Sequence, residues 1–314
     1  MKSLPYHDYG TWLSERLPYK VQRLPIDAGL SCPNRRGRAT NNGCIYCNNK
    51  AFSPRYSNPD ISISQQITQG KKFFEHKRQN CKYLAYFQSY TNTYAPNDKL
   101  KLMYEEALAD KDIVGLVIAT RPDCINEKLL DYWQELKERT FLIIEYGIES
   151  TNDKTLKVIN RGHDFECTKK AIEQTTSRGI ITGGHVILGL PGEDETDILN
   201  QASIVSSLPL QVLKIHHLQI IKDTKIEEMY NKGEISTFDM ESYVRLLSSY
   251  LQRIREDIAI DRLVSQSPKD MLIAPNWHIK PFEFNQKLRK YMEENGFINA
   301  DGSVAQFMKG KGAP

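Results

Sequence analysis

The chain has 314 residues, of which 40% are hydrophobic and 26% are charged, and its formal net charge is +3. This composition is typical of a folded globular protein and excludes a disordered or fibrous one, while the mildly basic balance permits an acidic partner without demanding one. No apolar run approaches the roughly 18 residues that a membrane helix needs, and the N-terminus shows no apolar signal segment, so we expect a cytoplasmic protein without a membrane partner.

Short runs rich in β-branched and aromatic residues recur along the chain, with helical patterns between them. They predict strands at residues 21–27, 83–89, 113–120, 141–148, 181–189 and 212–220. Strands that alternate with helices indicate βαβ units and a parallel sheet. The pattern does not choose between a barrel-like sheet and an open doubly wound one. In both, ligands gather at the carboxyl ends of the strands.

The pattern changes after about residue 236. Apolar and aromatic residues from 238 to 258 are spaced as one long amphipathic helix, a less regular stretch follows, and a last helix is predicted over residues 282–295. We therefore expect a core of residues 1–235 and a mainly helical extension of residues 236–314.

Three cysteines follow the first predicted strand, in the stretch SCPNRRGRATNNGCIYCNN. Cys44 and Cys47 form a C-x-x-C pair, which by itself is compatible with zinc, an iron–sulfur cluster or redox chemistry. A structural zinc site usually has four ligands, but the nearby sequence offers only a third cysteine, Cys32. Three thiolates would leave a [4Fe–4S] cubane with one open iron, which suits the binding of a substrate or cofactor.

Several further pieces stand in a recognisable order over roughly residues 18–235. They are LPIDAGLSCPNRRGRATNNGCIYCNN, the strand end Gln88–Thr93, ATRPD, EYGIES, INRGHDFECTKKAI, GGHVILGLPGE and LKIHHLQIIKDTKIEEMY. With them the sequence resembles the radical S-adenosylmethionine enzymes, and more narrowly the bacterial radical proteins related to the catalytic subunit of elongator. The commonest radical pattern has three residues between its first two cysteines, whereas eleven separate Cys32 from Cys44 here. The longer loop costs only about 1 kcal/mol in closure entropy, and long first spacings are typical of the elongator-like branch.

The resemblance implies an α/β fold: a partial (β/α)6 TIM-like barrel with a helical C-terminal extension. It implies a [4Fe–4S] cluster on Cys32, Cys44 and Cys47, with S-adenosylmethionine bound to the fourth iron. One electron, from a donor such as flavodoxin or ferredoxin, would then cleave the cofactor to a 5′-deoxyadenosyl radical. That radical abstracts a hydrogen atom from the substrate.

The resemblance also implies a set of residues that hold S-adenosylmethionine. An aromatic residue before the last cysteine packs near the adenine, the second strand end holds the methionine amine, and Glu149 would bind a ribose hydroxyl. The usual acid of the second strand end is absent here. An arginine suits the methionine carboxylate. The resulting candidates are Tyr46, Gln88, Thr91, Glu149, Ser150, Arg161 and Leu190. The alternatives are simple packing for Tyr46, a polar loop for Gln88 and Thr91, and a helix-end ion pair for the residues near 149–161.

Two residues are candidates for work on the substrate. Cys124 follows the third predicted strand and could donate a hydrogen atom. Strand alternation places His217 on the face opposite to His216, so one of the two faces the interior. The alternative for each is a structural residue of the core.

The family resemblance makes tRNA the expected partner, because elongator-like enzymes act on C5 of the wobble uridine. No acetyltransferase-like pattern follows residue 235, so we expect a later step, the loss of carboxymethyl from carboxymethylaminomethyluridine to give aminomethyluridine. Candidates for RNA contact are Arg35, Arg36 and Arg38 in the cysteine loop, and Trp277 as a base-stacking ring. The alternatives are a radical enzyme for a small metabolite or a protein, and a zinc-binding RNA module.

Overall fold

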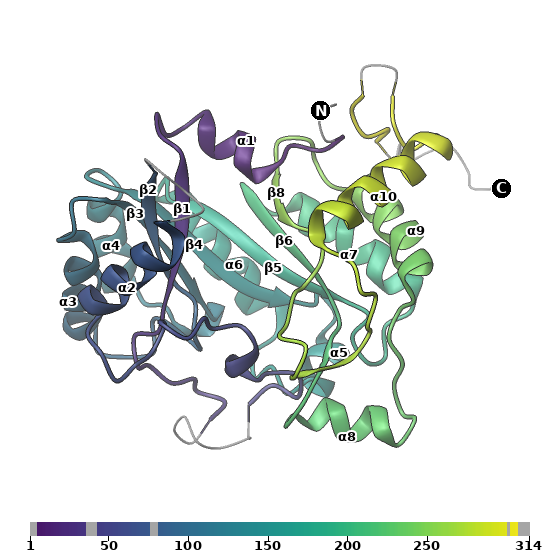
Figure 1. Cartoon of the computed structure of the whole chain (residues 1–314), viewed down its shortest axis with the longest axis horizontal. Coiled ribbons are helices and arrows are strands. Elements are labelled where there is room, and N and C mark those ends of the chain that lie inside the picture. Colours follow the sequence, from purple (N-terminus) through teal and green to yellow (C-terminus); the bar gives the residue numbers. More distant parts are fainter. Residues whose placement is uncertain (1–4, 36–42, 76–80, 300–301, 307–314) are drawn as a thin grey trace.

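The computed structural model describes residues 5–35, 43–75, 81–299 and 302–306. Within these residues, seven parallel strands form one curled sheet in the order β1-β2-β3-β4-β5-β6-β8 (Figure 1). The strands are β1 (Val21–Ile26), β2 (Lys82–Phe87), β3 (Ile113–Thr120), β4 (Phe141–Glu149), β5 (Ile181–Leu188), β6 (Val212–His217) and β8 (Ala259–Arg262). The predicted partial barrel is confirmed, and five of its six predicted strands agree with the structure within two residues at either end.

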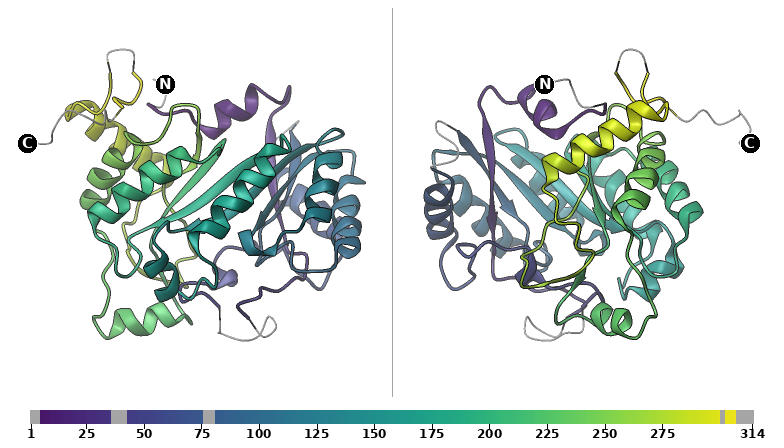
Figure 2. Two further views of the ribbon diagram at one scale, coloured as in Figure 1. Left: turned by 180° about the vertical axis from the view of Figure 1, so that it is seen from behind. Right: turned by 45° about the vertical axis from the view of Figure 1, so that its right-hand side comes forward.

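Helices cover the outer face of the sheet, as the two views in Figure 2 show. They connect consecutive strands and are α2 (Ile63–Glu75), α3 (Asn97–Leu108), α4 (Glu127–Leu136), α6 (Phe165–Ser177) and α7 (Glu195–Ser207). The starts of the last three are set by the side chains of Asn126, Asp164 and Asp194, which accept backbone N–H bonds in the first turn. The main apolar core lies between these helices and the outward side chains of the strands, such as Ile118 and Ile144.

The inner face of the sheet is closed at the amino ends of the strands. There α1 (Tyr9–Ser14) lies across the curl, and its buried Trp12 packs with Val117 and Ile143 of the inner face. The backbone of the preceding segment pairs with β8, since the N–H of Ile260 donates to the carbonyl of His7 at 2.7 Å. The N-terminal segment therefore blocks access to the interior of the curl from the amino ends of the strands.

The two outer strands of the sheet are also linked through the interior. The guanidinium of Arg23 on β1 donates to the carboxylate of Asp261 on β8 at 2.6 Å. These residues are 238 positions apart in the chain. The ion pair bridges the gap that an incomplete barrel leaves between its first and last strands.

The C-terminal region is helical in part, with α9 (Met240–Leu251) packed on α7 and α10 (Pro281–Glu294) packed on α9. The expectation of one long helix through residue 258 is wrong, because α9 ends at Leu251 and β8 begins at Ala259. Ile254 and Ile258 do bury in the outer core, as their spacing implied. The exposed backbone edge of β6 then pairs with Ala259–Arg262. This pairing makes the segment a strand instead of a continuation of the helix.

The strand expected over residues 212–220 is divided. β6 ends at His217, and β7 (Ile220–Ile221) pairs antiparallel with β9 (Leu272–Ala274) in a separate small sheet. The segment between β8 and α10, which contains β9, runs across the open side of the curl (Figures 1 and 2). Short elements at the carboxyl end complete the fold: η1 (Asn49–Ala51), η2 (Pro122–Cys124), α5 (Asp153–Val158) and α8 (Lys225–Asn231). Among the described residues, no helix combines the length and the apolar character of a membrane span.

Candidate active site

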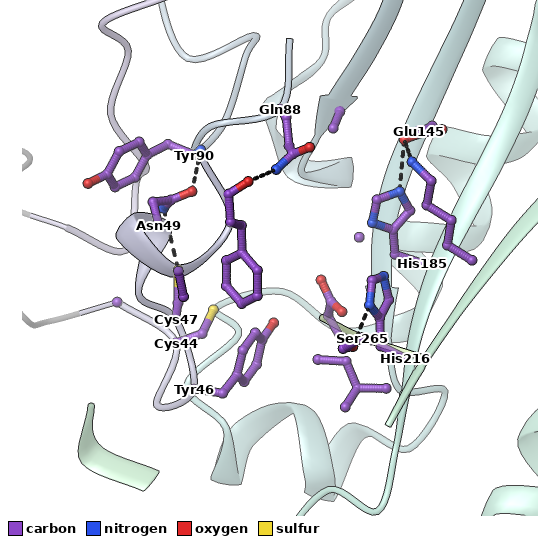
Figure 3. A pocket seen from close by; sticks show the side chains of 18 of the residues that line it. Cys44, Tyr46, Cys47, Asn49, Gln88, Tyr90, Glu145, His185, His216 and Ser265 are labelled. Atoms are coloured by element: carbon purple, nitrogen blue, oxygen red, sulfur yellow. Dashed lines mark hydrogen bonds and ion pairs between the residues drawn. The ribbon is translucent and has the colours of Figure 1, made fainter. Parts of the chain in front are cut away.

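A cavity of about 440 Å³ lies inside the curl, toward the carboxyl ends of the strands. The cysteine loop forms one side of it, and side chains of β4, β5, β6 and β8 form the other. Figure 3 shows Cys44, Tyr46 and Cys47 on the first side and Glu145, His185 and His216 on the second, with open space between them. The sequence correctly predicted that the cysteine loop and the strand ends meet.

All three predicted cysteine ligands line the cavity, and none is in a disulfide. Nitrogen donors point at two of their sulfurs. The amide of Asn34 and the guanidinium of Arg161 lie 3.6 and 3.7 Å from Cys44 Sγ, and the amide of Asn49 lies 3.6 Å from Cys47 Sγ. Such donors stabilise negatively charged sulfur, which is the form that binds metal. We refer to the three cysteines with Arg161 as the cysteine wall.

The turn after α5 clamps the cysteine loop. The amide of Asn160 donates to the carbonyl of Gly43 at 3.0 Å, and the amide of Asn34 donates back to the carbonyls of Asn160 and Arg161 at 2.6 and 2.9 Å. Gly162 has φ +82°, and a Cβ there would lie 2.5 Å from Asn34 Oδ1. Sequence reasoning singled out Arg161 in this turn but missed Asn34 and Asn160, although an Asn-Arg-Gly turn was a visible signal.

The donor set fits a cluster better than a single ion. Among the described residues, no three Cys, His, Asp or Glu side chains converge closely enough to hold one metal ion. A cubane contacts each cysteine through a different iron, so its three cysteines need not converge on one point. Burial, together with the neighbouring Cys44 and against the effect of Arg35, raises the pKa of Cys47 to about 11. A positively charged cluster would offset this cost of burying thiolates.

Five of the seven predicted cofactor residues also line the cavity: Tyr46, Gln88, Thr91, Glu149 and Arg161. The hydroxyl of Tyr46 points into the open space in Figure 3. Thr91 Oγ1 and Arg161 Nε are buried and have no hydrogen-bond partner in the described part of the chain. Buried polar groups are normally paired, so these two atoms fit a site for a polar ligand.

The other two predicted cofactor residues, Ser150 and Leu190, do not line the cavity. The hydroxyl of Ser150 donates to the carboxylate of Glu193, and Leu190 is buried in an apolar cluster with Ile45 and Ile187. Both residues support the loops at the carboxyl end rather than facing the open space.

The two substrate candidates are held in structural contacts. His217 borders the cavity, but its ring stacks on Trp277 at 4.3 Å and accepts the backbone N–H of Ser265, and burial lowers its pKa to about 3. Cys124 lies in η2 and is not among the cavity residues. Burial, with a contribution from Asp123, raises the pKa of its thiol to about 12. These contacts favour structural roles for both.

The four candidates for RNA contact differ in where the structure places them. Trp277 packs against His217, Tyr243 and Phe284, and its indole N–H donates to the carbonyl of Phe238. It is therefore a packing residue, and we do not retain it as a base-stacking ring. Arg35 lines the cavity and donates to the carbonyl of Cys47 at 2.8 Å, which braces the loop. Arg36 and Arg38 lie outside the described residues.

The opposite side of the cavity carries a cluster of charged residues that the sequence interpretation missed. The ammonium of Lys214 donates to Glu145 Oε2 at 2.6 Å and to the hydroxyl of Tyr86 at 2.8 Å. His185 Nε2 lies 2.9 Å from the same oxygen of Glu145. Burial alone would raise the pKa of Glu145, but Lys214, the bond from His185 and Arg23 hold it well below its usual value. The carboxylate is therefore ionised and accepts both bonds.

Strand register extends this cluster into a row. Gly147, His185, Lys214 and Arg262 are successive partners across β4, β5, β6 and β8, so they lie side by side on the inner face. A Cβ at Gly147 would collide with the guanidinium of Arg161 and the carboxylate of Glu149, so the absence of a side chain at this end of the row leaves room for those two groups. We refer to Glu145, His185, Lys214 and Arg262 as the charged wall. In the sequence, the charged wall is indicated only by a charged residue inside each of two strands that are otherwise mostly apolar.

Comparison with known proteins agrees with this geometry. Residues 35–202 match the model of the radical SAM superfamily, and residues 210–294 match that of the radical SAM C-terminal domain. The Bacillus subtilis protein YtqA is 34% identical over 291 residues, which cover 93% of this chain and 90% of the relative. A tRNA uridine(34) acetyltransferase of Methanocaldococcus infernus is 25% identical over 64% of this chain and 38% of the relative.

Among solved structures, the Methanocaldococcus infernus Elp3 superposes with a TM-score of 0.68 at 18% sequence identity. The superposition covers 88% of this chain and 63% of the Elp3 chain, so this chain spans less than two thirds of that protein. At this identity the likeness concerns the fold. The family match, the relatives and the cavity lined by three cysteines together show that the chain belongs to the radical SAM superfamily, whose enzymes use a [4Fe–4S] cluster and S-adenosylmethionine.

Proposed function

We propose that this protein modifies the C5 side chain of the wobble uridine in tRNA. The observation that carries the proposal is its similarity to tRNA uridine(34) acetyltransferases, one of which is 25% identical over 210 residues, or 64% of this chain. The similarity covers only 38% of that relative, so acetyl transfer is not carried over. We propose instead that the enzyme removes the carboxymethyl unit from carboxymethylaminomethyluridine and leaves aminomethyluridine.

In this proposal Cys32, Cys44 and Cys47 would hold the cluster, and S-adenosylmethionine would bind in the cavity that they line. When bound, these groups supply a 5′-deoxyadenosyl radical that takes one hydrogen atom from the substrate. We assign to the cofactor Thr91 Oγ1 and Arg161 Nε, which are among the buried atoms that have no hydrogen-bond partner in the described part of the chain. Tyr46 also lines the cavity, with its ring against the open space (Figure 3).

The substrate is suited to this chemistry at one carbon. Its CH2 group stands between an amine and a carboxylate, and both neighbours stabilise a radical there. Removal of one hydrogen atom, one electron and one proton, followed by addition of one water, releases the unit as glyoxylate and leaves aminomethyluridine. The electron balances the one consumed in cleaving S-adenosylmethionine.

His185 is the residue that we propose accepts the proton. Because the ionised Glu145 accepts from His185 Nε2, the neutral form of this ring carries its hydrogen on Nε2, and its acceptor is then Nδ1. Figure 3 shows the ring between Glu145 and the open space. A carboxylate that fixes the tautomer of a histidine in this way prepares the other nitrogen to act as a base.

The test compares wobble nucleosides in tRNA from cells with and without the gene. Carboxymethylaminomethyluridine should accumulate without it, and the reconstituted enzyme with dithionite should convert it to aminomethyluridine with release of glyoxylate and 5′-deoxyadenosine. Unchanged wobble uridine derivatives would contradict the proposal. If 5′-deoxyadenosine formed with a metabolite pool but not with tRNA, the substrate would be a small molecule.

A further inference from the structure

Arg262 differs from the other charged residues of the cavity because its side chain has no partner within the described residues. It lies on β8 beside Lys214 and lines the cavity. No hydrogen bond and no ion pair within 4 Å is formed by its guanidinium in the described chain. Its side chain is exposed to the open space.

The nearby carboxylates are already used by other cations. Asp261 accepts from Arg23 at 2.6 Å and lies 3.3 Å from the Lys214 ammonium, while Glu145 accepts from Lys214 and His185. Arg23 and Lys214 thus balance Glu145 and Asp261, which leaves the charge of Arg262 uncompensated. Burial holds the pKa of His216 well below its usual value, and Arg262 is the largest charge that adds to this shift.

Apart from Lys214 and Asp261, whose charges are paired with other residues, the side chains near Arg262 include polar groups without charge. The neutral ring of His216 is bonded through Nδ1 to the hydroxyl of Ser265 at 2.9 Å, and Gln219 and Gln266 also line this end of the cavity. An uncompensated guanidinium with neutral donors around it is a binding site for one small anion. The planar fork of arginine matches a carboxylate through two parallel hydrogen bonds.

The location of Arg262 favours a carboxylate on the modified base over an RNA phosphate. Arg262 lies on the wall opposite the cysteine loop, on the edge strand β8, and its side chain lines the cavity. An extruded base can enter such a pocket, whereas the backbone of folded RNA stays near the mouth. A C5 side chain that bridges the two walls would bring its terminal carboxylate to Arg262 and keep its CH2 toward the cysteine wall.

We propose that Arg262 binds the carboxylate of the uridine side chain and thereby selects the carboxymethylaminomethyl substrate. This inference rests on the proposed function and adds the group that is recognised. It makes Arg262 a specificity-determining residue. It also explains why the charged wall carries one more cation than its own carboxylates need.

The experiment uses the reconstituted holoenzyme and two anticodon stem-loops. One carries carboxymethylaminomethyluridine, and the other carries the carbamoylmethyl analogue, which has the same size but no charge. Dissociation constants are measured by fluorescence anisotropy for the unmodified enzyme and for Arg262→Gln and Arg262→Lys. Arg245→Gln serves as the matched control, since Arg245 is an exposed arginine of α9 outside the cavity.

The unmodified enzyme should prefer the charged RNA by about tenfold to a hundredfold, the range for a hydrogen-bonded charge pair. Arg262→Gln should reduce this preference to within about threefold, with unchanged affinity for the neutral RNA. Arg262→Lys should show an intermediate preference. Arg245→Gln should show the same preference as the unmodified enzyme. Thermal unfolding of each variant checks that the fold is retained.

Three outcomes would overturn the inference. The unmodified enzyme could show no preference for the charged RNA, the preference could survive Arg262→Gln, or Arg262→Gln could reduce the affinity for both RNAs equally. The last would assign Arg262 to a phosphate. Failure of the proposed function gives a different result. There the unmodified enzyme would bind the charged RNA with preference but would not convert it to aminomethyluridine, so binding and conversion are scored separately.

Discussion

The two walls of the cavity are built in opposite ways. The cysteine wall comes from one loop and one turn. Hydrogen bonds from asparagine side-chain amides to backbone carbonyls hold the loop and the turn together. The charged wall comes from four strands, and its side chains meet only because β4, β5, β6 and β8 lie side by side in register. This difference suggests that the first wall generates the radical, a task shared by the superfamily, and that the second wall handles what is particular to the substrate.

The largest effect is expected at the cysteine wall. Cys44→Ser should abolish the cluster, because serine does not replace a thiolate on iron, and product formation should fall below detection. Iron and sulfide content with the visible absorbance measures this after anaerobic reconstitution. Cys167→Ser is the matched control, since Cys167 lies on α6 outside the cavity. Equal loss in both variants would contradict the assignment.

The charged wall should be tested for stability as well as for chemistry. Glu145→Gln leaves Lys214 as a buried cation without its main partner, and we expect a loss of about 3–5 kcal/mol in the free energy of unfolding. The double variant Glu145→Gln with Lys214→Met should recover much of it, because no unpaired charge remains. Urea denaturation of the apoprotein measures both.

The control for the buried pair is an exposed one. Lys290 and Glu294 on α10 lie 3.7 Å apart, and Lys290→Met should change stability by no more than about 0.5 kcal/mol. If Glu145→Gln were equally mild, the charged wall would have no structural role, and its residues would be free to serve the substrate alone.

A third group, Glu193 in the loop between β5 and α7, responds to pH. Burial raises the pKa of Glu193 to about 7, against the hydrogen bonds from Ser150 and Thr155. The unfolded value is about 4.3, so between these two pH values the folded protein binds more protons and stability falls as pH rises. With a discount for partial exposure, we expect a loss of about 1–2 kcal/mol over this range.

Glu193→Gln should flatten this part of the pH profile and make the protein more stable than the unmodified chain at pH 8. Urea denaturation at pH 5, 6, 7 and 8 measures the effect. An unchanged slope in the variant would mean that Glu193 is solvated and that the pH dependence of stability arises elsewhere.

The smallest effect is expected for the arginines of the cysteine loop, and it separates bracing from RNA contact. Arg35→Gln removes the bond to the Cys47 carbonyl and should cost about 1 kcal/mol, seen as faster loss of cluster absorbance in air. The pair Arg36→Gln and Arg38→Gln should instead weaken tRNA binding and reduce its salt dependence, with normal cluster stability. If Arg35→Gln weakened tRNA binding and the Arg36 and Arg38 variant lost its cluster faster, the two roles would be exchanged.

Much of the fold was predictable because its signals are local. Strands β1 to β5 are short apolar runs between helical patterns, and most of their bounds agree with the structure within a residue or two. Strand β8 was not predictable, because Ile254 and Ile258 have helical spacing and only the unpaired edge of β6 turns the following residues into a strand. The split of the sixth strand likewise depends on pairing with β9, more than fifty residues later.

The site divides along the same line. Cys32, Cys44 and Cys47 carry a spacing that can be read directly, and Arg161 follows in a turn with its own motif. Nothing local distinguishes Lys214 from a surface lysine or Arg262 from a solvated arginine. The packing of His217 and Trp277 against each other was equally invisible, so both were assigned to the substrate when their contacts are structural.

By itself, the sequence determined the βα succession, the three cysteines and the family, since each depends on residues close together in the chain. Only the tertiary structure decided which charges face the cavity and which of them remain unpaired. The physical reason is that pairing a buried charge depends on distances across the sheet. Strand register and the closure of β1 toward β8 set those distances, and neither is written in any short stretch of the chain.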